Sequence, residues 1–409
     1  MSEDVIALGA EFISDPYALY TRLRMEQPVS EVTLPGNTRV WLVTRYAEAR
    51  IALSDPRFSK DGRRAAEVLP AQHAETDGKQ APAFIGALGR HMLNTDPPDH
   101  KRLRSLVSRA FTGRRIAALR PRIEVIAGDL LDSLPTGTPF GLLRDFAVPL
   151  PLTVICELLG IPEQERTEFR DWTDALVYAD APEQLMPAGR AMAGYLTELV
   201  ERKRVEPDEH LVSALTQADD AGDRLTRAEI TATVFLLLIA GYETTVNLIG
   251  NGTLALLLNP DQLAALRADE SLLSPAIEEF LRYEGPFNMA TMRFTLEPAE
   301  LGGAHIPAGA FVMVSLASAN HDPQRYPDPD RLDLARDTVG HLAFGHGVHY
   351  CLGAPLARLE ASIAFRGLLA RFPGMALAVP PSELRWRTSP VMRGLMELPV
   401  VLTSLKART

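Results

Sequence analysis

The spacing of hydrophobic and polar residues predicts a helical middle section flanked by strands on both sides. Helical periodicity dominates residues 100–281, and a shorter helix is expected at 16–26. Strands are expected at 29–34 and 40–43, within 293–318, and within 376–402. A turn at Pro35-Gly36-Asn37 joins the first two strands. Because no linker separates these segments, the pattern predicts one mainly α-helical domain over residues 1–409, with small β-sheets assembled from distant segments.

The longest predicted helix spans residues 226–258. Thr226 and Glu229 fit a capping box at its start, and Asn259-Pro260 ends it. At 1.5 Å per residue the helix is about 50 Å long, which is enough to cross the domain. Apolar residues occupy every face between Val234 and Ile239. We therefore expect this helix to be central and buried.

Composition and charge are those of an ordinary soluble globular protein. Hydrophobic residues make up 46% and charged residues 23% of the chain, and the formal net charge of −10 argues against a general nucleic-acid binder. The longest apolar uncharged stretch, residues 230–242, is shorter than the roughly 18 residues that a membrane span needs, and the N-terminus lacks signal-peptide features. We therefore expect a cytoplasmic protein without a membrane span.

The long helix contains the run Ala240-Gly241-Tyr242-Glu243-Thr244-Thr245. Gly241 in a helix interior costs about 1 kcal/mol relative to alanine, and an unpaired buried carboxylate costs more. The run allows two interpretations. In one, the small side chains let a flat group approach the backbone while Glu243 and Thr244 relay protons. In the other, Thr244 bonds back to the carbonyl four residues earlier and Glu243 faces solvent.

A second candidate site is the run Phe344-Gly345-His346-Gly347-Val348-His349-Tyr350-Cys351-Leu352-Gly353. Its glycines do not match the G-x-G-x-x-G of a dinucleotide loop, but they permit a tight turn around one sulfur. Cys351 lies at the start of a predicted helix, where the helix dipole favours a thiolate. A zinc site lacks a fourth ligand at the usual spacing, and a thiol hydrolase with His349 as its base lacks an identifiable oxyanion partner. Cys156 is the other cysteine, so a disulfide framework and a four-thiolate cluster are excluded.

Together these runs resemble the cytochrome P-450 superfamily. The cysteine-containing run is similar to the haem-binding loop, residues 240–244 to the oxygen-activation site, and Glu279-Phe280-Leu281-Arg282 to the Glu-x-x-Arg motif. The similarity extends to Asp96-Pro97-Pro98-Asp99-His100 with Arg104, and to Ala319-Asn320-His321-Asp322-Pro323 with Tyr326-Pro327-Asp328-Pro329. Small departures are Tyr242, where relatives often carry His, and Leu332, where they often carry Phe. Within this superfamily, the sequence most resembles soluble actinobacterial members. These hydroxylate macrolides, other polyketides and vitamin D-like sterols in secondary metabolism and antibiotic biosynthesis.

This resemblance implies the cytochrome P-450 fold and a haem b cofactor, iron protoporphyrin IX. Cys351 is the implied iron ligand, and a thiolate ligand favours O–O cleavage. The implied partners of the two haem propionates are His100, Arg104, Arg293 and His349, and Phe344 packs on the sulfur side of the ring. Glu243 and Thr244 are the implied catalytic residues, whereas Glu279 and Arg282 form a structural pair.

By position in the family, the residues expected to line the substrate pocket are mostly apolar. They are Ile85, Leu88, Leu237, Ala240, Thr244, Phe287, Met289, Ala290 and Met392. Methionine adapts to irregular shapes, so these residues indicate a bulky, largely apolar substrate.

The electron donor is expected to be a separate protein, since no flavin domain is apparent and two cysteines cannot hold an iron–sulfur cluster. Residues 101–120 carry only basic charges, namely Lys101, Arg102, Arg104, Arg109, Arg114, Arg115 and Arg120. An acidic ferredoxin, supplied by a ferredoxin reductase, fits this stretch. The leading function is a monooxygenase that puts one atom of O₂ into a lipophilic small molecule and releases the other as water. The alternatives are a non-catalytic haem-thiolate sensor, which needs no proton relay, and a peroxide-using variant, which needs no ferredoxin.

Overall fold

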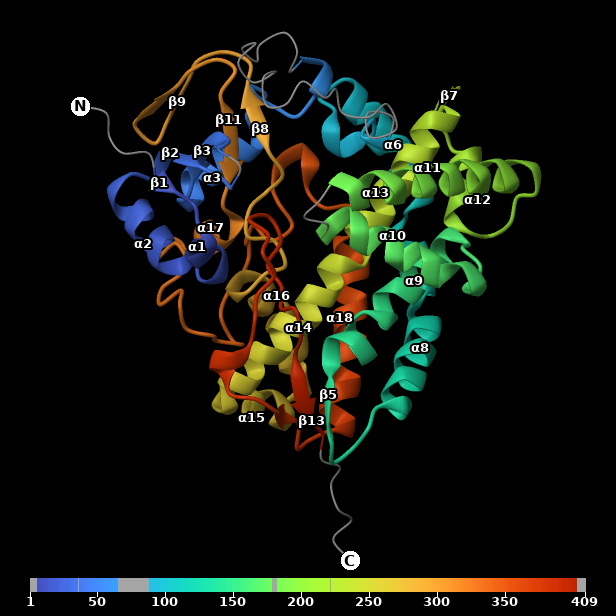
Figure 1. Ribbon diagram of the computed structural model, residues 1–409, viewed down its shortest axis with the longest axis vertical. Coiled ribbons are helices and arrows are strands. Elements are labelled where there is room, and N and C mark those ends of the chain that lie inside the picture. The colour runs from blue at the N-terminus through green and yellow to red at the C-terminus, as the bar shows by residue number, and fades with distance from the viewer. Residues whose placement is uncertain (1–5, 36, 65–87, 179–181, 221, 403–409) are drawn as a thin grey trace, which may run out of the picture.

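The largest sheet joins strands from the beginning of the chain to strands from residues 293–314. The computed structural model describes residues 6–35, 37–64, 88–178, 182–220 and 222–402. The sheet runs in the order β1 (Ile6–Ala7), β2 (Val29–Thr33), β3 (Arg39–Val43), β11 (Phe311–Val314), β8 (Arg293–Thr295), β4 (Phe58–Ser59). In Figure 1 the blue strands of the N-terminal region therefore lie beside the orange strands β8 and β11. The expected strands at 29–34 and 40–43 are confirmed as an antiparallel pair with Val29 opposite Val43.

The remaining sheets are small. β9 (Ala299–Leu301) pairs with β10 (Ala304–Ile306), and β6 (Asp219–Asp220) pairs with β7 (Asp223–Arg224). The expected strands of the tail form β12 (Ala376–Leu377) and β13 (Pro399–Val401), and β13 also pairs with β5 (Pro139–Gly141). Gly36 of the expected turn lies outside the described residues, whereas Asn37 has a φ of 62°, a conformation that asparagine tolerates better than most residues.

Helices make up most of the described chain, as the hydrophobic pattern predicts (Figure 1). They are α1 (Ala10–Ser14), α2 (Tyr17–Glu26), α3 (Tyr46–Ser54), α6 (Asp99–Ala110), α7 (Gly113–Ala118), α8 (Arg120–Ser133), α9 (Pro149–Leu159), α10 (Arg166–Tyr178), α11 (Pro182–Val205), α12 (Leu211–Gln217), α13 (Arg227–Gly241), α14 (Glu243–Leu258), α15 (Pro260–Ala268), α16 (Leu273–Tyr283), α17 (Leu316–Asn320) and α18 (Ala354–Arg371).

The predicted central helix is present as α13 and α14, with a local break at Tyr242. The capping box at its start is confirmed: Thr226 Oγ1 accepts from Glu229 N at 3.3 Å, and Glu229 Oε2 accepts from Thr226 N at 2.8 Å. At the break, the Thr244 hydroxyl donates to the carbonyl oxygen of Ala240 at 2.9 Å. The side chain thus takes the acceptor that an unbroken helix would offer to the Thr244 backbone N–H.

The central helix is buried, as expected. By length and composition the unit Arg227–Leu258 could cross a membrane, but 67% of its most apolar window is buried inside the protein, as in the core helix of a soluble protein. In Figure 1, α14 lies alongside α18 in the middle of the molecule. Gly252 of α14 permits this packing, because a Cβ at that position would lie 2.7 Å from Phe365 of α18.

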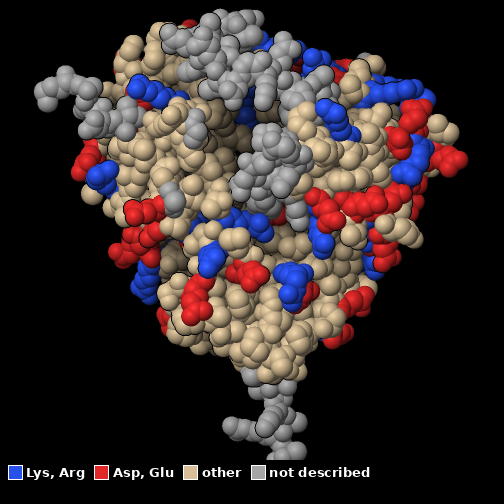
Figure 2. All heavy atoms as spheres, viewed as in Figure 1, with Lys and Arg blue, Asp and Glu red and all other residues tan. Residues whose placement is uncertain are grey.

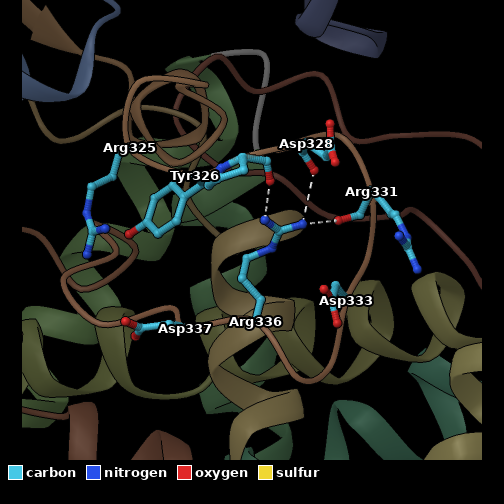
Figure 3. A pocket seen from close by; sticks show the side chains of 8 residues that line it. Arg325, Tyr326, Asp328, Arg331, Asp333, Arg336 and Asp337 are labelled. Atoms are coloured by element: carbon cyan, nitrogen blue, oxygen red, sulfur yellow. Dashed lines mark hydrogen bonds between the residues drawn. The ribbon is translucent and has the colours of Figure 1, made fainter.

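The pair formed by Glu279 and Arg282 on α16 is fully buried. Arg282 donates to both oxygens of Glu279, at 2.7 and 2.8 Å, and also to the carbonyl oxygens of Asn320 and Pro329. Arg336 approaches Glu279 at 3.3 Å and donates to the carbonyl oxygens of Asp328 and Arg331, both at 3.0 Å (Figure 3). Arg336 also lines a charged hollow, which has about 800 Å³ of space free of protein atoms, including the part that opens to solvent. The pair therefore anchors residues 320–336 to α16, which is the structural role that the sequence predicts.

Candidate active site

A large, mostly apolar cavity lies between the central helix, α6 and the segment that ends in Cys351. It has about 1460 Å³ of space free of protein atoms, including the part that opens to solvent. Many residues expected from the sequence meet on its wall: His100, Arg104, Leu237, Ala240, Thr244, Phe287, Ala290, Arg293, Phe344, His349 and Cys351. Residues from four separate runs of the sequence therefore converge on one site.

The loop before α18 exposes Cys351 to this cavity. The Cys351 N–H donates to the carbonyl oxygen of Phe344 at 2.9 Å, which closes the loop. Gly347 has a φ of 72°, and a Cβ there would lie 3.0 Å from the carbonyl oxygen of Leu53, so the close approach to α3 requires glycine. Burial raises the pKa of the Cys351 thiol, although backbone N–H groups at the start of α18 and the cation of Arg104 oppose this shift. A bound metal cation would favour the thiolate, because a coordinating thiol loses its proton.

A chain of polar contacts holds the beginning of this loop. The guanidinium carbon of Arg358 lies 4.5 Å from the centre of the Phe344 ring. Arg358 donates to both oxygens of Glu278, at 2.6 and 2.8 Å, and Glu278 also bonds His341 Nε2 at 2.9 Å. His341 Nδ1 in turn accepts from the Ala343 N–H at 3.3 Å. These contacts fix the ring of Phe344, which lines the same cavity as Cys351.

Cationic and imidazole groups gather on one side of the cavity. Arg104 donates to the carbonyl oxygen of Tyr350 at 2.7 Å, and the ring of His100 lies 4.4 Å from that of His349. The Nε2 atom of His100 is buried and has no hydrogen-bond partner among the residues that the structure describes. Burial and the surrounding positive charges lower the pKa of His349 to about 2. A site of this kind suits an anion with more than one charge, and it therefore fits the two propionate carboxylates of haem b.

The structure combines the two interpretations of residues 240–245. Thr244 lines the cavity and bonds back to Ala240, as the second interpretation expects. Glu243, however, is 2% exposed and does not face solvent. Its Oε1 atom lies 3.8 Å from Arg387 Nε of the C-terminal segment. Gly241 lines the cavity, and a Cβ there would lie 3.1 Å from Ile155 of α9, so its small size also serves helix packing.

Some of the expected substrate contacts are not part of the cavity wall formed by the described residues. Ile85 lies outside the described residues. Leu88 and Met392 do not line the cavity, and Met392 pairs instead with the backbone of Phe287. Met289 is fully buried in the cluster below the N-terminal sheet, because its neighbours Phe287 and Ala290 take the positions that face the cavity.

Several wall residues were not predicted from the sequence. Lys60 and Thr245 line the cavity, and Glu360 of α18 lies behind Thr245. Glu360 is 1% exposed, and among the described residues only the Thr245 hydroxyl acts on its carboxyl group, without forming a regular hydrogen bond. Burial raises the pKa of Glu360 well above its usual value, while Thr245 lowers it in part. Glu360 could have been found from the sequence, because it occupies a position on the apolar, buried face of a predicted helix. Lys60 belongs to no recognisable motif and could not have been found in this way.

Among the described residues, three of the seven basic side chains in this stretch, Arg102, Arg109 and Arg120, form ion pairs. Arg102 forms ion pairs with Asp223 and Glu229, and Arg109 pairs with Asp220. Basic and acidic side chains are likewise interspersed on the face shown in Figure 2. Lys101 is exposed and has no ion pair with any described residue. It lies three residues before Arg104, which bonds the carbonyl oxygen of Tyr350 next to Cys351, so the two side chains lie on the same side of α6.

Known proteins resemble this chain along nearly its whole length. The family described as Cytochrome P450 matches residues 182–382. The cytochrome P450 monooxygenase PikC of Streptomyces venezuelae is 52% identical over 401 residues, which cover 97% of this chain and 93% of PikC. The vitamin D(3) 25-hydroxylase of Pseudonocardia autotrophica is 48% identical over 393 residues, which cover 96% of this chain and 94% of that enzyme. The solved structure of the P450 monooxygenase TamI with tirandamycin C is 51% identical, with a TM-score of 0.90 over 97% of this chain and 100% of TamI.

Proposed function

The chain belongs to the cytochrome P450 family, and from this premise we propose that it hydroxylates or epoxidises a macrolide, another polyketide or a sterol-like compound. As a monooxygenase of this family it uses haem b and O₂. The vitamin D(3) 25-hydroxylase and the tirandamycin C bound to TamI support this substrate range. The apolar wall formed by Leu237, Ala240 and Phe287 suits such molecules.

The single observation that carries the proposal is the placement of Cys351 and Thr244 on the wall of one cavity. We assign the iron ligand to Cys351 and the propionate contacts to His100, Arg104, Arg293 and His349, with Phe344 beside the sulfur. When bound, the haem supplies a thiolate-ligated iron that activates O₂. The protein's own task is to hold the cofactor, exclude water and move protons.

The reaction consumes two protons, because the second oxygen atom leaves as water. We assign their delivery to Thr244 and Glu243. The Thr244 hydroxyl lies on the cavity wall, and rotation away from Ala240 would let it donate into the cavity. Glu243 is the next residue and is paired with Arg387, which is partly exposed, so the acid lies between the cavity wall and the protein surface.

Electrons in this proposal come from a ferredoxin and its reductase in the cytoplasm. The partner would bind near Lys101, which is exposed on the same side of α6 as Arg104, the residue that bonds Tyr350 next to Cys351. Arg102 and Arg109 contribute less to this surface than the sequence suggests, because Asp220, Asp223 and Glu229 balance their charges.

The substrate class is tested by titrating the haem-loaded protein with macrolides, sterols and fatty acids, and recording the type I spectral shift. We expect saturable shifts with macrolides or sterols. A cavity variant, Leu237→Trp, should weaken them at least tenfold, since the larger side chain fills space that the substrate needs. The matched control is Val205→Trp, at an exposed position on α11. Shifts with fatty acids alone would contradict the proposed substrate class.

A further inference from the structure

The pairing of two strands places Lys60 opposite Arg293. In the antiparallel pair of β4 and β8, Phe58 is opposite Thr295 and Ser59 is opposite Phe294. Continued one residue beyond the end of β4, this register brings Lys60 next to Arg293, and the charge of Arg293 acts on Lys60. Like charges directly opposite each other in a sheet are destabilising, so this arrangement needs a compensating negative charge.

Both cations are buried in the cavity wall. Lys60 is 7% exposed and Arg293 is 4% exposed, and both line the cavity. Thr291 serves both side chains: its hydroxyl accepts from Lys60 Nζ, and its carbonyl oxygen accepts from Arg293 Nη1 at 3.3 Å. An ammonium group has three N–H donors, so Thr291 satisfies only part of the capacity of Lys60.

The nearby negative charge is too small to balance these cations. Asp96 is the carboxylate that acts on both Lys60 and Arg293. It also accepts from the Ser59 hydroxyl and the Lys60 backbone N–H, and it lies 3.7 Å from Arg64. Burial and the charge of Arg293 lower the pKa of Lys60 well below its usual value. A buried lysine without adequate compensation is costly, which points to a ligand that brings negative charge.

We propose that Lys60 is a cofactor-binding residue whose ammonium donates to a propionate carboxylate of haem b beside Arg293. The inference rests on the proposed placement of haem in this cavity and does not depend on the substrate. A single anionic cofactor would then balance Lys60, Arg293 and Arg104 together, and it would explain why the sheet tolerates two opposed cations.

The test distinguishes the contribution of the haem carboxylates to binding from that of the rest of the cofactor. Apoprotein carrying Lys60 or Lys60→Met is reconstituted with haem b and, separately, with haem b dimethyl ester, in which both carboxylates are blocked. The rate of transfer to excess apomyoglobin is followed by absorbance. Lys60→Met should lose haem b about 10- to 100-fold faster, because loss of a hydrogen bond between charged groups changes a binding constant by about that factor. The dimethyl ester should leave both proteins at similar rates.

Controls distinguish this role from a general effect of charge or packing. Arg64→Met removes a neighbouring cation that is more exposed and should leave haem loss unchanged. Lys60→Arg should retain haem nearly as well as lysine, and Lys60→Gln replaces Lys60→Met if that variant does not fold. Equal acceleration for haem b and its ester would overturn the proposal in favour of a packing role. Unchanged haem loss would also overturn it, and a weakened substrate shift in that case would assign Lys60 to the substrate. A wild-type protein without a haem-thiolate spectrum would instead refute the proposed function.

Discussion

Glu243 on the central helix is paired with Arg387 in the C-terminal segment, with 3.8 Å between Oε1 and Nε. The glutamate side chain is 3% exposed and the arginine side chain is 22% exposed. Arg387 is held in place by its backbone, since its N–H donates to the carbonyl oxygen of Gly394 at 2.9 Å. The acid assigned to proton delivery therefore depends for its charge balance on a residue more than a hundred positions away in sequence.

Removing Arg387 should destabilise the protein. Arg387→Gln leaves the carboxylate of Glu243 without this cation, and we expect the free energy of unfolding to fall by about 1–3 kcal/mol. The double variant Arg387→Gln/Glu243→Gln should recover much of this loss, because no charge is then left unbalanced. Urea unfolding measures both, and Arg385→Gln, at an exposed position, is the control. An additive double variant would show that the two side chains do not interact.

Replacing Cys351 should abolish the haem-thiolate spectrum. Cys351→Ser offers a poorer ligand, and the reduced protein with CO should lose the red-shifted Soret band of thiolate ligation. Cys156→Ser is the control, because Cys156 is buried in α9 and burial raises its pKa, so it remains an unreactive thiol. Retention of the band in Cys351→Ser would assign the ligand elsewhere.

Replacing Thr244 should separate oxygen uptake from product formation. Thr244→Ala removes the hydroxyl on the cavity wall while leaving the groups around Cys351 intact. We expect haem binding and NADPH-driven oxygen uptake to persist, with product per electron pair reduced severalfold and hydrogen peroxide released instead. Thr244→Ser should restore much of the yield. Full coupling in the alanine variant would mean that another group delivers the protons.

The buried carboxyl of Glu360 should make stability depend on pH. Its pKa is raised by burial, so the folded protein keeps a proton that the unfolded chain releases near pH 4.3. The folded state then binds more protons, and the free energy of unfolding falls as pH rises from that value toward the folded pKa, by up to about 1.4 kcal/mol per pH unit. Glu360→Gln should remove this decline, measured by urea unfolding between pH 5 and 8. Glu383→Gln, at an exposed position, should leave the decline unchanged.

Reversing the charge of Lys101 should slow reduction by ferredoxin. Lys101→Glu should lower the association rate several-fold at low ionic strength and flatten its dependence on salt, because steering charges act mainly on association. Stopped-flow reduction measures the rate, and Arg267→Glu on α15 provides a control for net charge. Equal effects of the two substitutions would indicate a general rather than a local electrostatic contribution.

The predictable parts of the fold are those set by local pattern. The capping box of Thr226 and Glu229 and the pair of Glu279 and Arg282 depend on residues three apart, and both are present in the structure. The break at Tyr242 was not predicted, although the bond from the Thr244 hydroxyl to Ala240 was part of one of the two interpretations of this run. Arg387 was missed as the partner of Glu243 because nothing local connects them.

In the candidate active site, too, local sequence patterns were predictable and contacts between distant residues were not. The run ending in Cys351 identifies its own loop through its glycines and cysteine, and the structure places that loop on the cavity wall. Whether Met289 or its neighbours Phe287 and Ala290 face the cavity depends on the backbone turn after α16, which composition does not determine. Lys60 could be recognised as a cavity residue only in the structure. It follows β4, which pairs with β8 more than two hundred positions later in the chain.

The order of the largest sheet also constrains biosynthesis. β3 ends at Val43, but its parallel neighbour β11 ends at Val314. At about 5–20 residues per second, a ribosome needs roughly 15–50 s to synthesise the intervening chain. During that interval one edge of the β2–β3 hairpin has no partner strand, and such edges promote association between chains. We therefore expect nascent chains released before β11 is complete to aggregate, and co-translational chaperone binding should be concentrated in this interval.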